Sequence, residues 1–148
     1  MLGVLGVVFG HRLFLSVLSS WTIVQAIKVI IPLIKEKKLK WHRFVEPGGM
    51  PSSHAAAVIA LLTGVGILEG CGSTIFILTL IFALVTIYEA IGVRKTVQEQ
   101  AELLDIIIRK NPPKNFVRSK LRKSLGHTPL EVGVGIVIGF IISLIWMT

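Results

Sequence analysis

The stretch Gly48-Gly49-Met50-Pro51-Ser52-Ser53-His54 separates a basic segment from a long apolar run and sets the point where a helix begins. Glycine and proline are typical of a turn, and serine is a preferred N-cap residue. We therefore predict a helix that starts at Ser52 or Ser53, with Gly49 in the preceding turn and His54 in the first helical turn. The N–H groups of such a start suit phosphate, and a histidine there can exchange a proton with it. The alternative is a capped helix without a ligand, whose histidine lies at a membrane interface.

The composition indicates a protein that lies in lipid. Of its 148 residues 53% are hydrophobic, and the mean hydropathy of +0.78 is too high for an ordinary soluble domain. A net charge of +8 would suggest nucleic acid as the partner of a soluble protein. Beside apolar runs, however, basic residues set topology and attract anionic headgroups. We therefore expect membrane lipids, and no nucleic acid, as partners.

Apolar runs long enough to cross a bilayer recur along the chain. At the helical rise, the first run of roughly 22 residues reaches about 33 Å. Residues 94–110 place their apolar side chains on one stripe, which predicts an amphipathic helix that lies on the membrane surface or packs over the bundle. The predicted fold class is an all-α polytopic bundle of about four spanning helices plus this cytoplasmic helix, in a single membrane domain over residues 1–148. The predicted spans are residues 13–34, 54–70, 73–92 and 129–147.

The positive charges fall on one side of this predicted bundle. Every Lys and Arg except Arg12 and Lys28 lies between the first and second spans or between the third and fourth. By the positive-inside rule that side is cytoplasmic. The sequence thus predicts a multi-pass protein of the plasma membrane, or of the inner membrane in a bacterium, with its polar site on the cytoplasmic side.

Polar side chains interrupt the first span along one face. Trp21, Gln25, Lys28 and Pro32 recur at spacings of four, three and four, so this face is expected to turn away from lipid. Lys28 either snorkels to the headgroups or turns inwards to hold an anion. Its partnership with Gln25 on one face favours the second alternative.

Glu89 and Arg94 lie where the third span leaves the membrane, on the same side as His54. They are predicted to form an ion pair, or else Arg94 clamps a phosphate with its two parallel donors. With Lys28 reaching up from the first span, these residues predict a site for a phosphate group whose attached chain lies in the bilayer.

The last span begins with a second histidine. Thr128, Pro129 and Glu131 have the spacing of a capping box, and Glu131 also lies four residues after His127, where it can orient the imidazole. One histidine is expected to attack phosphorus while the other protonates the departing oxygen.

Further along the last span, Gly135 and Gly139 form a small-xxx-small face for close helix packing. This face is predicted to act within the bundle or between subunits of a homo-oligomer.

Three motifs carry a resemblance to a known family. They are Gly-Gly-Met-Pro-Ser-Ser-His at 48–54, Tyr-Glu-Ala-Ile-Gly-Val-Arg at 88–94 and Leu-Gly-His-Thr-Pro-Leu-Glu-Val at 125–132. They closely resemble the divergent branch of the type 2 phosphatidic acid phosphatase superfamily, which is related to vanadium-dependent haloperoxidases. The resemblance covers nearly the whole chain, from about Gln25 to the last helix.

The resemblance implies a role for each matching residue. It implies that His54 donates the proton, that His127 is the nucleophile with Glu131 in the place of an aspartate, and that Lys28 is the lysine of the first superfamily motif. It implies no metal and no cofactor for phosphatase members.

Some positions depart from the superfamily pattern. Ser53 replaces a glycine, and the Arg-Pro expected after the lysine is missing. Lys120 and Leu121 occupy the places of the expected Ser-Arg, so Arg94 or Arg122 would have to supply the cation.

The sequence therefore predicts a metal-independent integral membrane phosphatase that hydrolyses a lipid phosphate or diphosphate, of polyprenyl or phosphatidyl type, through a phosphohistidine. One alternative is a catalytically silent lipid-phosphate-binding protein or scaffold. Another is a transport component whose path is lined by Gln25, Lys28 and Glu89, although the polar groups gather at one end of the spans and do not continue to the other.

Overall fold

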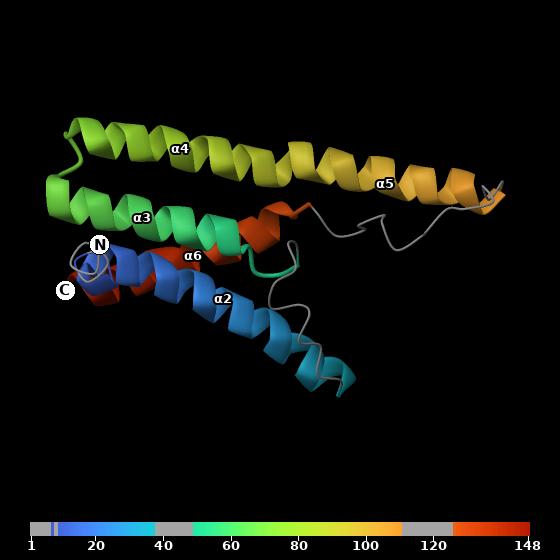
Figure 1. Cartoon of the computed structure of the whole chain (residues 1–148), viewed down its shortest axis with the longest axis horizontal. Helices are drawn as coiled ribbons and strands as arrows, with labels where there is room; N and C mark the ends of the chain where they lie inside the picture. The colour runs from blue at the N-terminus through green and yellow to red at the C-terminus, as the bar shows by residue number, and fades with distance from the viewer. Residues whose placement is uncertain (1–6, 8, 38–48, 111–125) are drawn as a thin grey trace.

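The computed structural model describes residues 7, 9–37, 49–110 and 126–148 (Figure 1). These residues contain helices and no strand, which confirms the predicted all-α membrane bundle. In chain order the helices are α2 (Arg12–Glu36), α3 (Ser53–Glu69), α4 (Thr74–Ile91), α5 (Val93–Lys110) and α6 (Pro129–Met147).

Three helical stretches are long and apolar enough to cross a membrane. They are Arg12–Ile34 in α2, the α4–α5 stretch Thr74–Lys110, and α6. The remaining apolar helix, α3, has 17 residues and is shorter. At the helical rise it reaches only about 25 Å, less than the hydrocarbon core of a typical bilayer.

The short helix α3 lies at the centre of the bundle, in contact with α2, α4 and α6. Its buried side chains are small, with alanines, glycine and serine outnumbering valines. Small side chains let helix backbones approach closely, which is how helices associate where lipid tails are as apolar as the side chains. The composition of α3 therefore explains its central position.

The glycine face of α6 packs against α3 of the same chain. A Cβ atom at Gly135 would lie 2.5 Å from the carbonyl oxygen of Ser52, and a Cβ atom at Gly139 would collide with the backbone of Ala56. Of the two predicted uses of this face, the structure shows the one within the bundle. The use between subunits of a homo-oligomer stays a prediction, and in the structure α3 occupies the surface around Gly135 and Gly139.

The polar face of α2 is turned into the bundle over most of its length. Gln25, Lys28 and Pro32 are buried, as predicted. Ser16 and Ser20, which the sequence argument did not use, continue this face and donate to carbonyl groups of their own helix. Trp21 is 36% exposed, so the expectation that it faces away from lipid was wrong for part of its ring.

Helix α5 continues the direction of α4 and leads away from the bundle (Figure 1). Gly92 separates the two helices and caps α4, its N–H donating to the carbonyl oxygen of Tyr88 at 2.8 Å. Among the described helices α5 contacts α4 alone, so it does not pack over the bundle. Large apolar residues of α5, such as Leu103 at 61% and Ile107 at 64%, are exposed.

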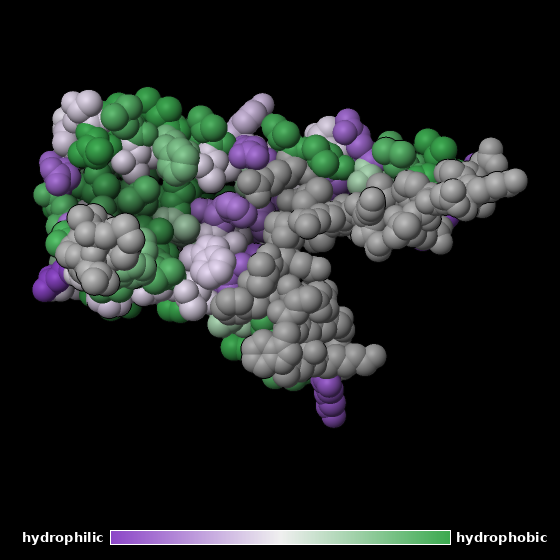
Figure 2. All heavy atoms as spheres, in the orientation of Figure 1, coloured by the Kyte–Doolittle hydropathy of each residue, from purple (hydrophilic) through white to green (hydrophobic). Residues whose placement is uncertain are grey.

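The polar residues gather at one end of the bundle. Figure 2 shows hydrophobic residues over the helices on the left of the view and hydrophilic residues near the middle, where α3 and α6 begin. The first turn of α2 and the last turn of α6 lie at the opposite end (Figure 1).

Candidate active site

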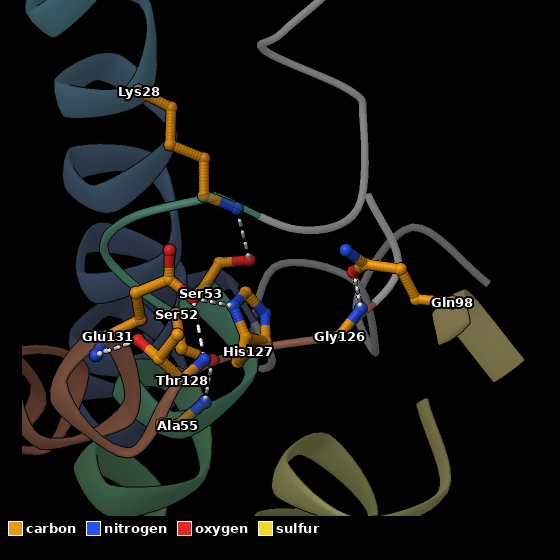
Figure 3. Close-up of polar contacts among 9 residues, drawn as sticks. All are labelled: Lys28, Ser52, Ser53, Ala55, Gln98, Gly126, His127, Thr128 and Glu131. Carbon is orange, nitrogen blue, oxygen red and sulfur yellow. Dashed lines mark hydrogen bonds and ion pairs between the residues drawn. The ribbon is translucent and has the colours of Figure 1, made fainter. Parts of the chain in front are cut away.

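The site is built where the N-termini of α3 and α6 meet (Figure 3). Ser52 is the N-cap of α3, its hydroxyl oxygen accepting from the Ala55 N–H at 3.4 Å. The N–H of Ser52 donates to the carbonyl oxygen of Glu131, in the first turn of α6, at 3.0 Å. Both helices thus direct the positive ends of their dipoles to the same region.

A lysine from α2 reaches this region from inside the bundle. Lys28 is only 5% exposed, and its Nζ atom donates to the hydroxyl oxygen of Ser53 at 3.4 Å (Figure 3). The inward orientation, rather than snorkelling to the headgroups, is therefore the one the structure shows.

His127 lies just before the N-cap of α6 and is 1% exposed. Its Nδ1 atom is 3.5 Å from the Oε2 atom of Glu131, an ion-pair distance. Because Nδ1 faces the carboxylate, Nε2 is the ring nitrogen turned away from it.

The predicted capping box at the start of α6 is confirmed. The Thr128 hydroxyl oxygen accepts from the N–H of Glu131 at 3.3 Å, and the Oε2 atom of Glu131 accepts from the N–H of Thr128 at 2.8 Å. The carboxylate that faces His127 is thus the same one that caps the helix. The structure thus shows the capping role of Glu131 and brings the same carboxylate to His127, while its part in orienting the imidazole stays a prediction.

The backbone of His127 is attached to α4. Its N–H donates to the carbonyl oxygen of Ala90 at 3.2 Å. In an unbroken helix that carbonyl would accept from an N–H four residues later, but the break at Gly92 makes it available. The helix break at Gly92 therefore leaves the carbonyl group of Ala90 to hold the backbone of His127.

The other predicted site residues lie around this group. His54 is the second residue of α3 and is partly buried, and Glu89 is partly buried in the last turn of α4. Gly49 has a φ of +76°, a conformation that other residues adopt at a cost, so its turn requires glycine. Arg94 is in the first turn of α5, but its side chain lies outside the described residues.

Lys120, Leu121 and Arg122 also lie outside the described residues, as does most of the basic segment before α3.

The sequence argument missed the residues that hold the loop before α6. The N–H of Gly126 donates to the Oε1 atom of Gln98 in α5 at 3.1 Å (Figure 3). Gln98 was not among the site residues predicted from the sequence. The glycine directly before His127 was the available signal, because glycine permits close approach of two backbones.

Comparison with known proteins agrees with this architecture. The chain is 38% identical over 143 residues to the uncharacterized membrane protein YuiD of Bacillus subtilis (strain 168), covering 88% of this chain and 90% of the relative. No solved structure matches the chain. The model of the divergent PAP2 family matches residues 9–142. This match spans nearly all the described helices and both histidine motifs, and the chain therefore belongs to the divergent PAP2 family.

Proposed function

We propose that this membrane protein is a metal-independent phosphatase that hydrolyses a lipid phosphate or diphosphate, of polyprenyl or phosphatidyl type, on the cytoplasmic side of the membrane. One observation carries the proposal. A buried histidine faced by a carboxylate, His127 with Glu131, lies beside the buried Lys28–Ser53 pair at the start of a second helix. A nucleophile and an anion-binding cradle are thus combined at one end of a membrane bundle.

The phosphate group would bind between the starts of α3 and α6. Lys28 supplies a positive charge, the first turn of α3 supplies hydrogen-bond donors, and the dipoles of both helices add to the positive potential. Gln25 lies one turn further along the same buried face of α2, towards the middle of the bundle. The lipid chain would leave the phosphate in that direction, and Arg94 would add a second cation from the aqueous side.

In the first step the lone pair of His127 Nε2 attacks phosphorus and a nitrogen–phosphorus bond forms. The bond from phosphorus to the lipid oxygen breaks, and that oxygen takes a proton from His54. The carboxylate of Glu131 stabilises the positive charge that develops on His127, as an acidic partner does in other histidine systems. Lys28 and the helix N–H groups stabilise the added negative charge on the phosphoryl oxygens.

In the second step water attacks the phosphohistidine. His54, now neutral, takes a proton from the water, the nitrogen–phosphorus bond breaks, and inorganic phosphate leaves. Each proton given by His54 in the first step is recovered in the second, so the cycle is closed.

The test measures release of inorganic phosphate from polyprenyl and phosphatidyl phosphates and diphosphates by detergent-purified protein. His127→Ala and His54→Ala are expected to lower kcat by at least about 10³-fold in protein that circular dichroism shows to be folded. His11→Asn is the matched control, because His11 is the N-cap of α2 at the opposite end of the bundle and asparagine is also a good N-cap. This variant is expected to keep wild-type turnover.

The affinity for vanadate, which mimics the phosphoryl group in the transition state of its transfer, measures anion binding independently of turnover. Lys28→Met is expected to weaken vanadate binding by about tenfold or more because it removes a buried cation. Tight vanadate binding without turnover on any lipid would overturn the enzyme assignment and favour the silent lipid-phosphate-binding protein.

A further inference from the structure

Two consecutive residues of the loop that carries the nucleophile are tied to two different helices. The N–H of Gly126 donates to Gln98 in α5 at 3.1 Å, and the N–H of His127 donates to the carbonyl oxygen of Ala90 in α4 at 3.2 Å. The loop thus bridges the break at Gly92 between these two helices. The second tie uses main-chain atoms only, whereas the first depends on a side chain.

The orientation of the Gln98 amide is set by its neighbour on the same helix. Its Nε2 atom donates to the Oε1 atom of Glu102, one turn further along α5, at 3.1 Å. A carboxylate can only accept, so it must face the NH₂ end of the amide, and the oxygen is left to face Gly126. Glu102, Gln98 and Gly126 therefore form a directed series of hydrogen bonds that leads to His127.

Close packing holds the loop at the same place. A Cβ atom at Gly126 would lie 2.6 Å from the Cα atom and 2.9 Å from the nitrogen of Lys95, so only glycine allows this approach to α5. The packing of Gly126 against Lys95 thus sets the distance of the loop from α5, and the hydrogen bond to Gln98 sets the direction of the Gly126 N–H.

We propose that Gln98, oriented by Glu102, is a positioning residue that sets the imidazole of His127 for attack on phosphorus. This inference rests on the proposed function, in which His127 is the nucleophile. An error of about 1 Å in the position of a reacting group can lower a rate by roughly 10²-fold. The helix α5, which contacts no other described helix than α4, thereby gains a part in the reaction.

The experiment exchanges the two side chains of the series. Gln98→Ala removes the acceptor and is expected to lower kcat by about 10- to 100-fold, with KM changed less than about twofold. Gln98→Glu keeps an acceptor but places two carboxylates together, so kcat is also expected to fall. In the double variant Gln98→Glu/Glu102→Gln, the carboxylate at position 98 again accepts from Gly126 and the amide at position 102 donates to it. This variant is expected to recover kcat to within about threefold of the wild type.

Gln100→Ala is the matched control, because Gln100 is exposed on the same helix. It is expected to leave kcat, KM and thermal unfolding unchanged. Vanadate affinity provides a readout that needs no turnover, since vanadate would bond to Nε2 of the same histidine. Gln98→Ala is expected to weaken vanadate binding about tenfold relative to Gln100→Ala.

The outcomes separate this inference from the proposed function. Wild-type kcat and vanadate affinity in Gln98→Ala, together with loss of turnover in His127→Ala, would overturn the positioning role and keep the nucleophile. A double variant no more active than Gln98→Glu would also overturn it. Full turnover in His127→Ala would instead remove the proposed function itself.

Discussion

Glu131 makes the starts of α3 and α6 a single polar unit. Its carboxylate accepts from the N–H of Thr128 and faces His127, while its carbonyl oxygen accepts from the N–H of Ser52. The local part of this pattern was predictable from sequence, because a capping box needs only residues three apart. The contact with Ser52 was not, since it joins residues that are far apart in the chain.

The two roles of Glu131 can be separated by substitution. Glu131→Gln keeps an oxygen that can cap Thr128 but removes the charge beside His127, so kcat is expected to fall by at least about 10²-fold with little change in thermal unfolding. Glu131→Ala also removes the cap and is expected to cost a further 0.5–2 kcal/mol, roughly, of stability. Phosphate release and thermal unfolding of both variants check this. Equal kcat in Glu131→Gln and the wild type would leave Glu131 with capping alone.

At the level of the helices, the site depends on the close packing of α3 against α6, because the starts of these two helices form it. The backbone of Ser52 lies over Gly135, and that of Ala56 lies over Gly139 one turn further along. The sequence indicated which face of α6 would pack closely, because small residues recurred at a spacing of four. It did not indicate the partner, since lipid, another subunit and another helix of the chain would all accept such a face.

A pair of alanine substitutions in α6 tests this contact. Gly139→Ala forces the backbone of α3 away and is expected to cost about 1–3 kcal/mol of stability. Gly133→Ala is the control in the same helix, because a Cβ atom there would meet nothing within 4 Å. It is expected to be neutral or slightly stabilising, since alanine favours helix more than glycine does. Thermal unfolding in one detergent compares the two variants, and equal unfolding temperatures would contradict the packing described.

The amphipathic pattern of residues 94–110 predicted a helix and its apolar face, and α5 has both. Its direction did not follow from the pattern. A glycine such as Gly92 is compatible with a sharp turn onto the bundle as well as with a continued axis, and the periodicity of side chains contains no information about the axis. The structure has the continued axis (Figure 1).

For the molecule as a whole, the apolar runs were sufficient to predict an all-α bundle whose polar residues gather at one end. Successive spans alternate in direction, so Lys28, His54 and Glu131 had to come to the same end. Which of these side chains touch depends on how α2, α3 and α6 are rotated about their axes. That rotation is decided by contacts between distant residues, and so the Lys28–Ser53 bond could not be predicted.

The sidedness of the site can be tested with the only cysteine of the chain. Cys71 is exposed in the turn between α3 and α4, at the opposite end from the candidate site. A membrane-impermeant thiol reagent is expected to label it from outside intact cells, because the basic side is predicted to be cytoplasmic. In a Cys71→Ser background, Glu99→Cys on α5 is expected to react only after the membrane is opened. The reverse pattern would place the site on the outer face.

The tie between the N–H of Ser52 and the carbonyl oxygen of Glu131 also has a consequence for biosynthesis. The lysine of the site is made early and the histidine that faces Glu131 late. At 5–20 residues per second, the ribosome needs roughly 5–20 s to add the roughly 100 residues between them. Once residue 69 has been added, the nascent chain has α2 and α3 but still lacks α6, the helix that completes the cradle. If the protein is the phosphatase proposed above, a ribosome-bound or prematurely terminated chain lacks the nucleophile and leaves the lipid phosphates of its membrane intact.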